Sequence, residues 1–266
     1  MTRSTISFGV CCGVDQIALV RQAGFGFVEP GVVSLLAPEL SDEEWKLPVI
    51  ESGSAPVANM MLPGDLAVVG DSVDQARIRR YVKVMCDRAA RVGIRTIVFG
   101  AGRSRRVPDG FPRDRAFEQI VWFLGEAAAV AVERKVTIAI EPLNSMECNI
   151  INSIAEAATF MKAVDSPAVK LLFDTYHAWM DREPLSNLRA VANKVAHVHV
   201  ADRDGRIAPG VSGLSDYRPV FRILREANYQ GLISIEARNF SPTNFIRDDG
   251  PNAVLKFLTR QWNESI

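Results

Sequence analysis

Four short apolar segments of the chain each end on a side chain that commonly binds divalent cations. The segments are residues 137–141, 170–174, 195–199 and 232–236. Two glutamates, an aspartate and a histidine suit one cation such as Mn²⁺, Co²⁺ or Mg²⁺, with Zn²⁺ as a further candidate. The four segments therefore predict a single metal site whose ligands are Glu141, Asp174, His199 and Glu236.

The elements that must position these ligands alternate along the whole chain. Strand-like runs are expected at residues 5–11, 25–30, 55–61, 95–100, 136–142, 169–175, 195–201 and 232–237. Helical runs are expected at residues 15–24, 40–51, 72–93, 114–134, 153–165, 183–193, 216–227 and 252–263. Eight strands paired with eight helices predict an α/β fold, a (β/α)8 TIM barrel, in which the carboxyl ends of the strands carry the chemistry. No linker divides the chain, so residues 1–266 form one domain.

Strand alternation places the four ligands on one common face. In residues 137–141, Ala139 and Glu141 share a face while Ile138 and Ile140 take the opposite one. The other three segments repeat this pattern. The face rich in large apolar side chains suits packing against the outer helices, so the ligand face is expected to point into the barrel.

Each ligand taken alone has a simpler interpretation. An acidic residue after a strand is more often a helix N-cap or a turn residue, and a lone histidine is more often a hydrogen-bonded core residue. However, four successive strands deliver four ligand-type side chains at one level. The only three histidines of the chain, His177, His197 and His199, also fall in these segments. The combined pattern favours metal binding.

Composition and charge narrow the classes of function. Hydrophobic residues make up 48% of the 266 residues, which is enough for a large core. Lys+Arg and Asp+Glu both number 31, which argues against binding nucleic acid through its phosphates. The four cysteines have no disulfide-framework spacing, and the start lacks a signal-peptide pattern, so a reduced, cytoplasmic protein is expected. No apolar run approaches the roughly 20 residues of a membrane span, so no membrane partner is expected.

These segments resemble the xylose-isomerase-like TIM barrel superfamily, which includes sugar isomerases, sugar epimerases and endonuclease IV. The resemblance is specific mainly in residues 138–152, 171–179, 195–210 and 232–238. Ile140-Glu-Pro-Leu-Asn144 is similar to a segment of ketose 3-epimerases and hydroxypyruvate isomerase-like members whose glutamate binds the metal. Asp174-Thr-Tyr-His177 is similar to a D-T-x-H segment whose aspartate is the second ligand. The resemblance implies His199 and Glu236 as the remaining two ligands.

The resemblance also implies residues that contact the substrate. His177 matches a histidine that contacts a substrate oxygen. Glu147 occupies the place of a further substrate-contacting acid, with an exposed loop acid as the competing interpretation. The epimerases carry an arginine six residues after the metal histidine, where this chain has Gly205. A one-residue insertion would give that role to Arg206, and Arg203 is an alternative contact.

The predicted activity is that of an isomerase, either a sugar epimerase or an aldose–ketose isomerase, acting on a small carbohydrate or its phosphate. Glu141 and Glu236 are assigned as the acid/base pair as well as ligands. One takes an α-proton, a metal-stabilised enediolate forms, and the other returns the proton. Return to the opposite face gives epimerisation, whereas transfer to the neighbouring carbon gives aldose–ketose isomerisation.

Other functions fit parts of this pattern. An inosose- or dehydroshikimate-dehydratase-like enzyme would start from the same enolate, and a sugar-binding protein without turnover would keep only the binding site. Endonuclease IV chemistry needs three zinc ions and extra histidines, whereas this chain has no histidine before His177. The sequence does not determine the oligomeric state and is compatible with a homo-oligomer.

Two weaker signals concern the substrate. The Gly-rich segment at residues 99–106, with three arginines, could grip a phosphate or carboxylate, and a solvated basic loop is the competing interpretation. Glu29, at the end of the second strand, is expected to bind substrate hydroxyls. His197 lies deeper on its strand than His199 and is expected to support it or to satisfy the core.

Overall fold

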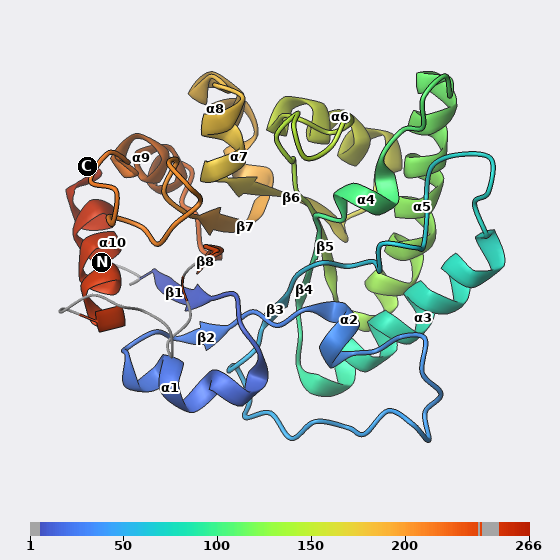
Figure 1. The fold of residues 1–266 in the computed structure, drawn as a ribbon, viewed down its shortest axis with the longest axis horizontal. Helices are drawn as coiled ribbons and strands as arrows, with labels where there is room; N and C mark the ends of the chain where they lie inside the picture. The colour runs from blue at the N-terminus through green and yellow to red at the C-terminus, as the bar shows by residue number, and fades with distance from the viewer. Residues whose placement is uncertain (1–5, 239, 241–249) are drawn as a thin grey trace.

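The computed structural model describes residues 6–238, 240 and 250–266, in which eight parallel strands form a nearly closed barrel (Figure 1). The strands are β1 Ser7–Val10, β2 Phe27–Val28, β3 Val57–Ala58, β4 Thr96–Phe99, β5 Thr137–Ile140, β6 Val169–Asp174, β7 Val195–Val200 and β8 Leu232–Ile235. Their order in the sheet is β2-β1-β8-β7-β6-β5-β4-β3. The predicted (β/α)8 TIM barrel is confirmed.

The barrel closes at a seam between β2 and β3, which are its two shortest strands. Gly31 and Asn59, just beyond these strands, form an isolated parallel bridge. The Asn59 backbone N–H donates to Pro30 O at 3.0 Å, and the Val32 N–H donates to Asn59 O at 2.8 Å. Val28 of β2 also donates its N–H to Ser54 O at 2.8 Å, so the seam is held by this bond and by residues that follow the strands on the side of the predicted site.

Helices surround the strands, as the alternating pattern predicts. They are α1 Ile17–Gln22, α2 Val32–Leu35, α3 Gln75–Val92, α4 Gly102–Arg105, α5 Arg113–Arg134, α6 Ile154–Val164, α7 Thr175–Met180, α8 Leu185–Val191, α9 Arg218–Glu226 and α10 Gly250–Glu264, with 3₁₀ turns η1 Val14–Gln16 and η2 Ala192–Lys194. The long pair α3 and α5 packs side by side on one flank, and α9 packs with α10 on the other (Figure 1). Among the described helices, none is both long enough and apolar enough to cross a membrane.

The helix predicted at residues 40–51 is wrong, because the chain forms turns and irregular backbone there. Ser41 and Glu44 do bond to each other's backbone N–H groups, at 3.2 and 2.9 Å, as at a helix start. Pro48 disfavours helix at the residue before it. The buried Arg88 also donates a hydrogen bond to Leu40 O at 2.8 Å. A tertiary contact thus replaces the bond that this carbonyl would accept within a helix.

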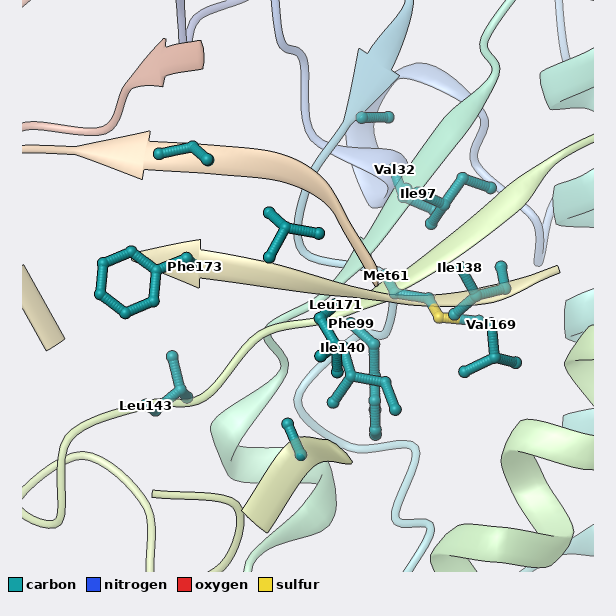
Figure 2. Close-up of a cluster of buried hydrophobic side chains, with 14 of the residues drawn as sticks. Val32, Met61, Ile97, Phe99, Ile138, Ile140, Leu143, Val169, Leu171 and Phe173 are labelled. Carbon is teal, nitrogen blue, oxygen red and sulfur yellow. The ribbon is translucent and has the colours of Figure 1, made fainter. Parts of the chain in front are cut away.

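The core has two layers, separated by the strands. Ile138 and Ile140 of β5 pack outward, in the same cluster as Leu171 and Phe173 of β6 (Figure 2). A separate inner cluster fills the barrel and consists of Phe27, Val57, Val98, Ala139 and Leu172, with Leu232 against it. Ala139 thus faces inward while its neighbours face outward, which confirms the predicted alternation and directs Glu141 into the barrel.

Candidate metal centre

The four predicted ligands meet at the carboxyl end of the barrel. Asp174 and His199 are register partners in the β6–β7 pairing, while Glu141 and Glu236 directly follow β5 and β8. One ligand atom from each residue lies within 4.8 Å of those of the others. Glu141, Asp174 and His199 are buried and Glu236 is partly exposed, so the cluster opens toward the barrel mouth.

The two ring nitrogens of His199 face different partners. Its Nδ1 lies 3.0 Å from a Glu141 oxygen, 3.2 Å from a Glu236 oxygen and 3.9 Å from Asp174 Oδ2. Its Nε2 lies 2.8 Å from Glu29 Oε1. A proton held on Nε2 by Glu29 leaves the Nδ1 lone pair for a cation among the three carboxylates, as in carboxylate–histidine–metal arrangements.

Glu29 supports the histidines, so its predicted role in binding substrate hydroxyls is wrong. Its carboxylate is only 1% exposed, and its second oxygen lies 2.8 Å from His197 Nε2. Ser234 Oγ also lies 3.1 Å from that nitrogen. Both oxygens of Glu29 are therefore occupied, and His197 supports His199 through this shared carboxylate.

The electrostatics of the four-residue cluster are those of crowded, buried acids. Burial raises the pKa of Glu141, and the nearby Glu236 adds to the shift, although His199 opposes it. Burial also acts to raise the pKa of Glu236, but His199 and Arg206 outweigh it and hold that pKa at about 2. Burial acts to lower the pKa of His199, but Glu29, Glu236 and Glu141 outweigh it and raise that pKa well above its ordinary value. When the ring gives up its Nδ1 proton, this nitrogen and the three carboxylates form a donor set that fits one divalent cation.

Asp174 has two separate functions, one for each oxygen. Its Oδ1 accepts the backbone N–H groups of Tyr176 at 2.6 Å and His177 at 3.1 Å, which makes it the N-cap of α7. Its Oδ2 is the oxygen that faces His199. The helix-cap and the ligand interpretations of this residue are therefore compatible.

His177 keeps one ring nitrogen available. Its Nδ1 accepts the Asn144 backbone N–H at 3.1 Å, so the neutral ring carries its proton on Nε2. Among the residues that the structure describes, this buried Nε2 has no hydrogen-bond partner, and it lies 3.9 Å from Asp174 Oδ2. The ring thus presents an unused donor beside the cluster.

Arg206 lies at the mouth of the site, between two acids. Its guanidinium is 2.5 Å from Glu236 and 3.6 Å from Glu147, and it stacks over the Tyr176 ring at 5.1 Å. The structure thus brings the predicted substrate-contacting residues Arg206 and Glu147 together beside Glu236. Arg203 instead pairs with Asp204, at 3.8 Å, and is exposed.

Two of the three arginines in residues 99–106 bond to backbone carbonyls beside the site, and the predicted anion grip by this segment stays a prediction. Arg105 is fully buried and donates to Phe99 O and Glu141 O, both at 2.7 Å. Arg106 donates to the Glu147 carbonyl at 2.8 Å. A charged residue in a sequence is usually expected to face solvent. These two arginines instead form hydrogen bonds to the backbone of neighbouring loops.

A second group with metal-binding potential overlaps the first. Cys11, Glu29 and His199 also place ligand atoms within 4.8 Å of one another. Burial raises the pKa of the Cys11 thiol well above its ordinary value, and the Glu29 charge adds to the shift. Both Glu29 oxygens are also taken by histidines, which leaves the four predicted ligands as the better cation site.

The family model described as xylose isomerase-like TIM barrel matches residues 17–261 of the chain. Among curated relatives, 3-dehydro-D-guloside 4-epimerase of Escherichia coli K12 is 28% identical over 235 residues, covering 85% of this chain and 87% of the relative. Inosose dehydratase of Clostridium beijerinckii is 31% identical over 108 residues, covering 33% of this chain and 36% of the relative. Relatives named as epimerases and isomerases support the prediction of an isomerase-type enzyme.

Solved structures share the fold over nearly the full chain. A crystal structure of D-psicose 3-epimerase in the presence of D-fructose has a TM-score of 0.79 with 18% sequence identity. The alignment covers 97% of this chain and 99% of that one. At this identity the likeness supports the barrel architecture and nothing finer.

Glu29→Gln should weaken divalent cation binding by about 10- to 100-fold, because the amide loses the charge and one acceptor that orient His199. Titration calorimetry of Mn²⁺ into chelator-treated protein measures the affinity. Glu118→Gln, an exposed change on α5, is the matched control. An unchanged Mn²⁺ affinity in Glu29→Gln would show that Glu29 does not prepare the ligand.

Arg105→Met should lower the free energy of unfolding by about 2–4 kcal/mol, because it removes the guanidinium donors from two buried carbonyls and leaves Phe99 O with only the Glu141 N–H. Arg106→Gln, at the exposed neighbour, should change it by less than about 0.5 kcal/mol. Denaturant titrations compare the two variants with the parent protein. Equal effects would contradict the distinct role of Arg105.

Proposed function

The chain belongs to the xylose isomerase-like TIM-barrel family, and we propose that it is a divalent-metal-dependent sugar epimerase or isomerase. One observation carries the proposal: two glutamates, an aspartate and the Nδ1 side of His199 converge within 4.8 Å at the carboxyl end of the barrel. This end of a TIM barrel is where catalytic residues gather.

Glu141, Asp174, His199 and Glu236 would hold the cation, for which Mn²⁺, Co²⁺ and Mg²⁺ are the proposed candidates and Zn²⁺ a further one. When bound, the cation would stabilise the negative charge that develops on a keto sugar as its α-proton leaves. The fit rests on the donor set and on the orientation of His199, whose Nε2 faces Glu29 while its Nδ1 faces the carboxylates of the cluster.

Glu141 and Glu236 are the proposed proton carriers. One carboxylate breaks the α-carbon–hydrogen bond and takes the proton, and the electron pair stays on the substrate as an enediolate. The other carboxyl group returns a proton. Their carboxyl oxygens lie 3.0 and 3.2 Å from His199 Nδ1, so a substrate within the cluster would contact both.

Three further residues would orient the sugar. The Nε2–H of His177 is a buried donor without a partner among the described residues, and a substrate oxygen would satisfy it. Arg206 and Glu147, at the mouth, offer a donor and an acceptor to hydroxyl groups. Arg105 and Arg106 bond to backbone carbonyls, which supports an uncharged sugar as the proposed substrate, with a sugar phosphate as the alternative.

A dehydratase is the second candidate, favoured by the similarity to inosose dehydratase over 108 residues. It would share the first proton abstraction and then expel a hydroxyl group. The same residues could serve both reactions, so the two activities are distinguished by identifying the product.

The deciding experiment is an NMR screen for α-proton exchange in D₂O with Mn²⁺-loaded protein. The panel contains D-fructose, D-tagatose and D-psicose, their phosphates, and small keto acids. We expect the Mn²⁺-loaded protein to introduce deuterium at the α-carbon. This exchange should stop after EDTA treatment and resume when Mn²⁺ is added back. Loss of water from the product would indicate the dehydratase, and exchange that persists without metal, or no exchange across the panel, would contradict the proposal.

Glu141→Gln and Glu236→Gln should each lower turnover by about 10³-fold or more, because an amide cannot accept the α-proton. Folding should survive, since the amide keeps the size of the side chain. Circular dichroism checks the fold, and Glu118→Gln serves as the control. A glutamine variant that retains near-parental turnover would remove that residue from the acid/base pair.

A further inference from the structure

The loop between β7 and α9 carries Arg206 to the mouth of the site. Gly205 and Arg206 both adopt left-handed backbone conformations, with φ of +79° and +52°. Arg206 O also accepts the Arg238 N–H at 2.8 Å. The guanidinium reaches Glu236 and Glu147 only if this irregular loop is held in place.

Asp202 supplies the strongest attachment of that loop. It is fully buried just after β7, and its two oxygens accept four hydrogen bonds. Oδ1 accepts Gly210 N at 3.0 Å and Tyr217 Oη–H at 2.9 Å, while Oδ2 accepts Ser212 N at 2.8 Å and Ser212 Oγ–H at 2.7 Å. One carboxylate thus fastens both the middle and the end of the loop.

The Asp202 backbone closes the loop around Arg206. Its N–H donates to Ile207 O at 2.8 Å, so the chain returns to its starting point immediately after the arginine. Tyr217 is itself fully buried, and its ring contacts Trp179 and Phe221. The bond from Asp202 to Tyr217 therefore connects the loop to the rigid core.

The chemistry of this attachment requires a carboxylate. No Lys, Arg or His side chain forms an ion pair with Asp202 in the part of the chain that the structure describes, so hydrogen bonds alone stabilise the buried group. Asparagine has a single acceptor oxygen, and its NH₂ group would face N–H or O–H donors. An amide of the same size would thus break at least one side of the attachment.

We propose that Asp202 is a positioning residue that fixes the loop of residues 203–217 and thereby sets the place of Arg206 for substrate binding. The substrate part of this inference rests on the proposed function, since it takes Arg206 as a sugar contact. The part about the loop stands on the hydrogen bonds alone.

Hydrogen exchange of the full-length protein, followed by mass spectrometry, tests the loop without any substrate. In Asp202→Asn, amides of residues 203–213 should exchange about tenfold faster or more, because Gly210 N or Ser212 N then faces the NH₂ group and loses its acceptor. Tyr217→Phe removes one of the four bonds and should give a smaller change in the same peptides. Asp109→Asn, a change of the same kind at an exposed position outside the loop, is the matched control and should match the parent.

Kinetics with Mn²⁺ and D-psicose as the probe test the link to Arg206. Asp202→Asn and Arg206→Gln should each raise KM by about 10- to 100-fold, and the double variant should be little worse than either. A general loss of stability would instead lower the active fraction and leave KM unchanged.

The outcomes separate the two proposals. Parental exchange rates in Asp202→Asn would overturn the role of Asp202, and so would faster exchange with an unchanged KM. Full additivity in the double variant would also overturn it, since the two residues would then act independently. If the parent protein does not turn over D-psicose, that result counts against the proposed activity, while hydrogen exchange still decides whether Asp202 fixes the loop.

Discussion

Mutual repulsion among three carboxylates is the constraint that organises the carboxyl end of this barrel. Glu141, Asp174 and Glu236 present oxygens within 4.8 Å of one another. Two unit charges 4 Å apart repel by about 4 kcal/mol at an effective dielectric constant of 20. His199 lies between these groups, Arg206 covers Glu236, and Arg105 bonds to the backbone of Glu141. Positive and polar groups from several loops thus surround an acidic centre that a cation would complete.

Three of the four candidate ligands are held by an atom that faces away from the centre. Asp174 is fixed through the oxygen that caps α7, His199 through the nitrogen that faces Glu29, and Glu141 through its main-chain carbonyl. This separation lets the metal-facing atoms remain free while the side chains stay rigid. Preorganisation of this kind lowers the cost of ordering ligands when a cation or substrate arrives.

The barrel and the four ligands could be predicted from the sequence because both depend on local periodicity. Strand alternation alone directs Glu141 inward, and the register of β6 with β7 then aligns Asp174 with His199. Other features depend on contacts between distant segments. The role of Glu29 requires knowing that β2 faces β7 across the interior, and Arg105 reads as a surface residue until its two carbonyl partners are known. The false helix at residues 40–51 has the same cause.

Glu29 follows a strand at the seam of the barrel, so its contacts also bear on how that strand is held in place. β2 has only two residues, and beyond it a single bridge joins the sheet edges. Glu29 follows this strand and reaches across the interior to two histidines on β7. This contact ties the short edge strand β2 to β7 across the interior of the barrel. A substitution of Glu29 would therefore affect both the orientation of the two histidines and the attachment of β2.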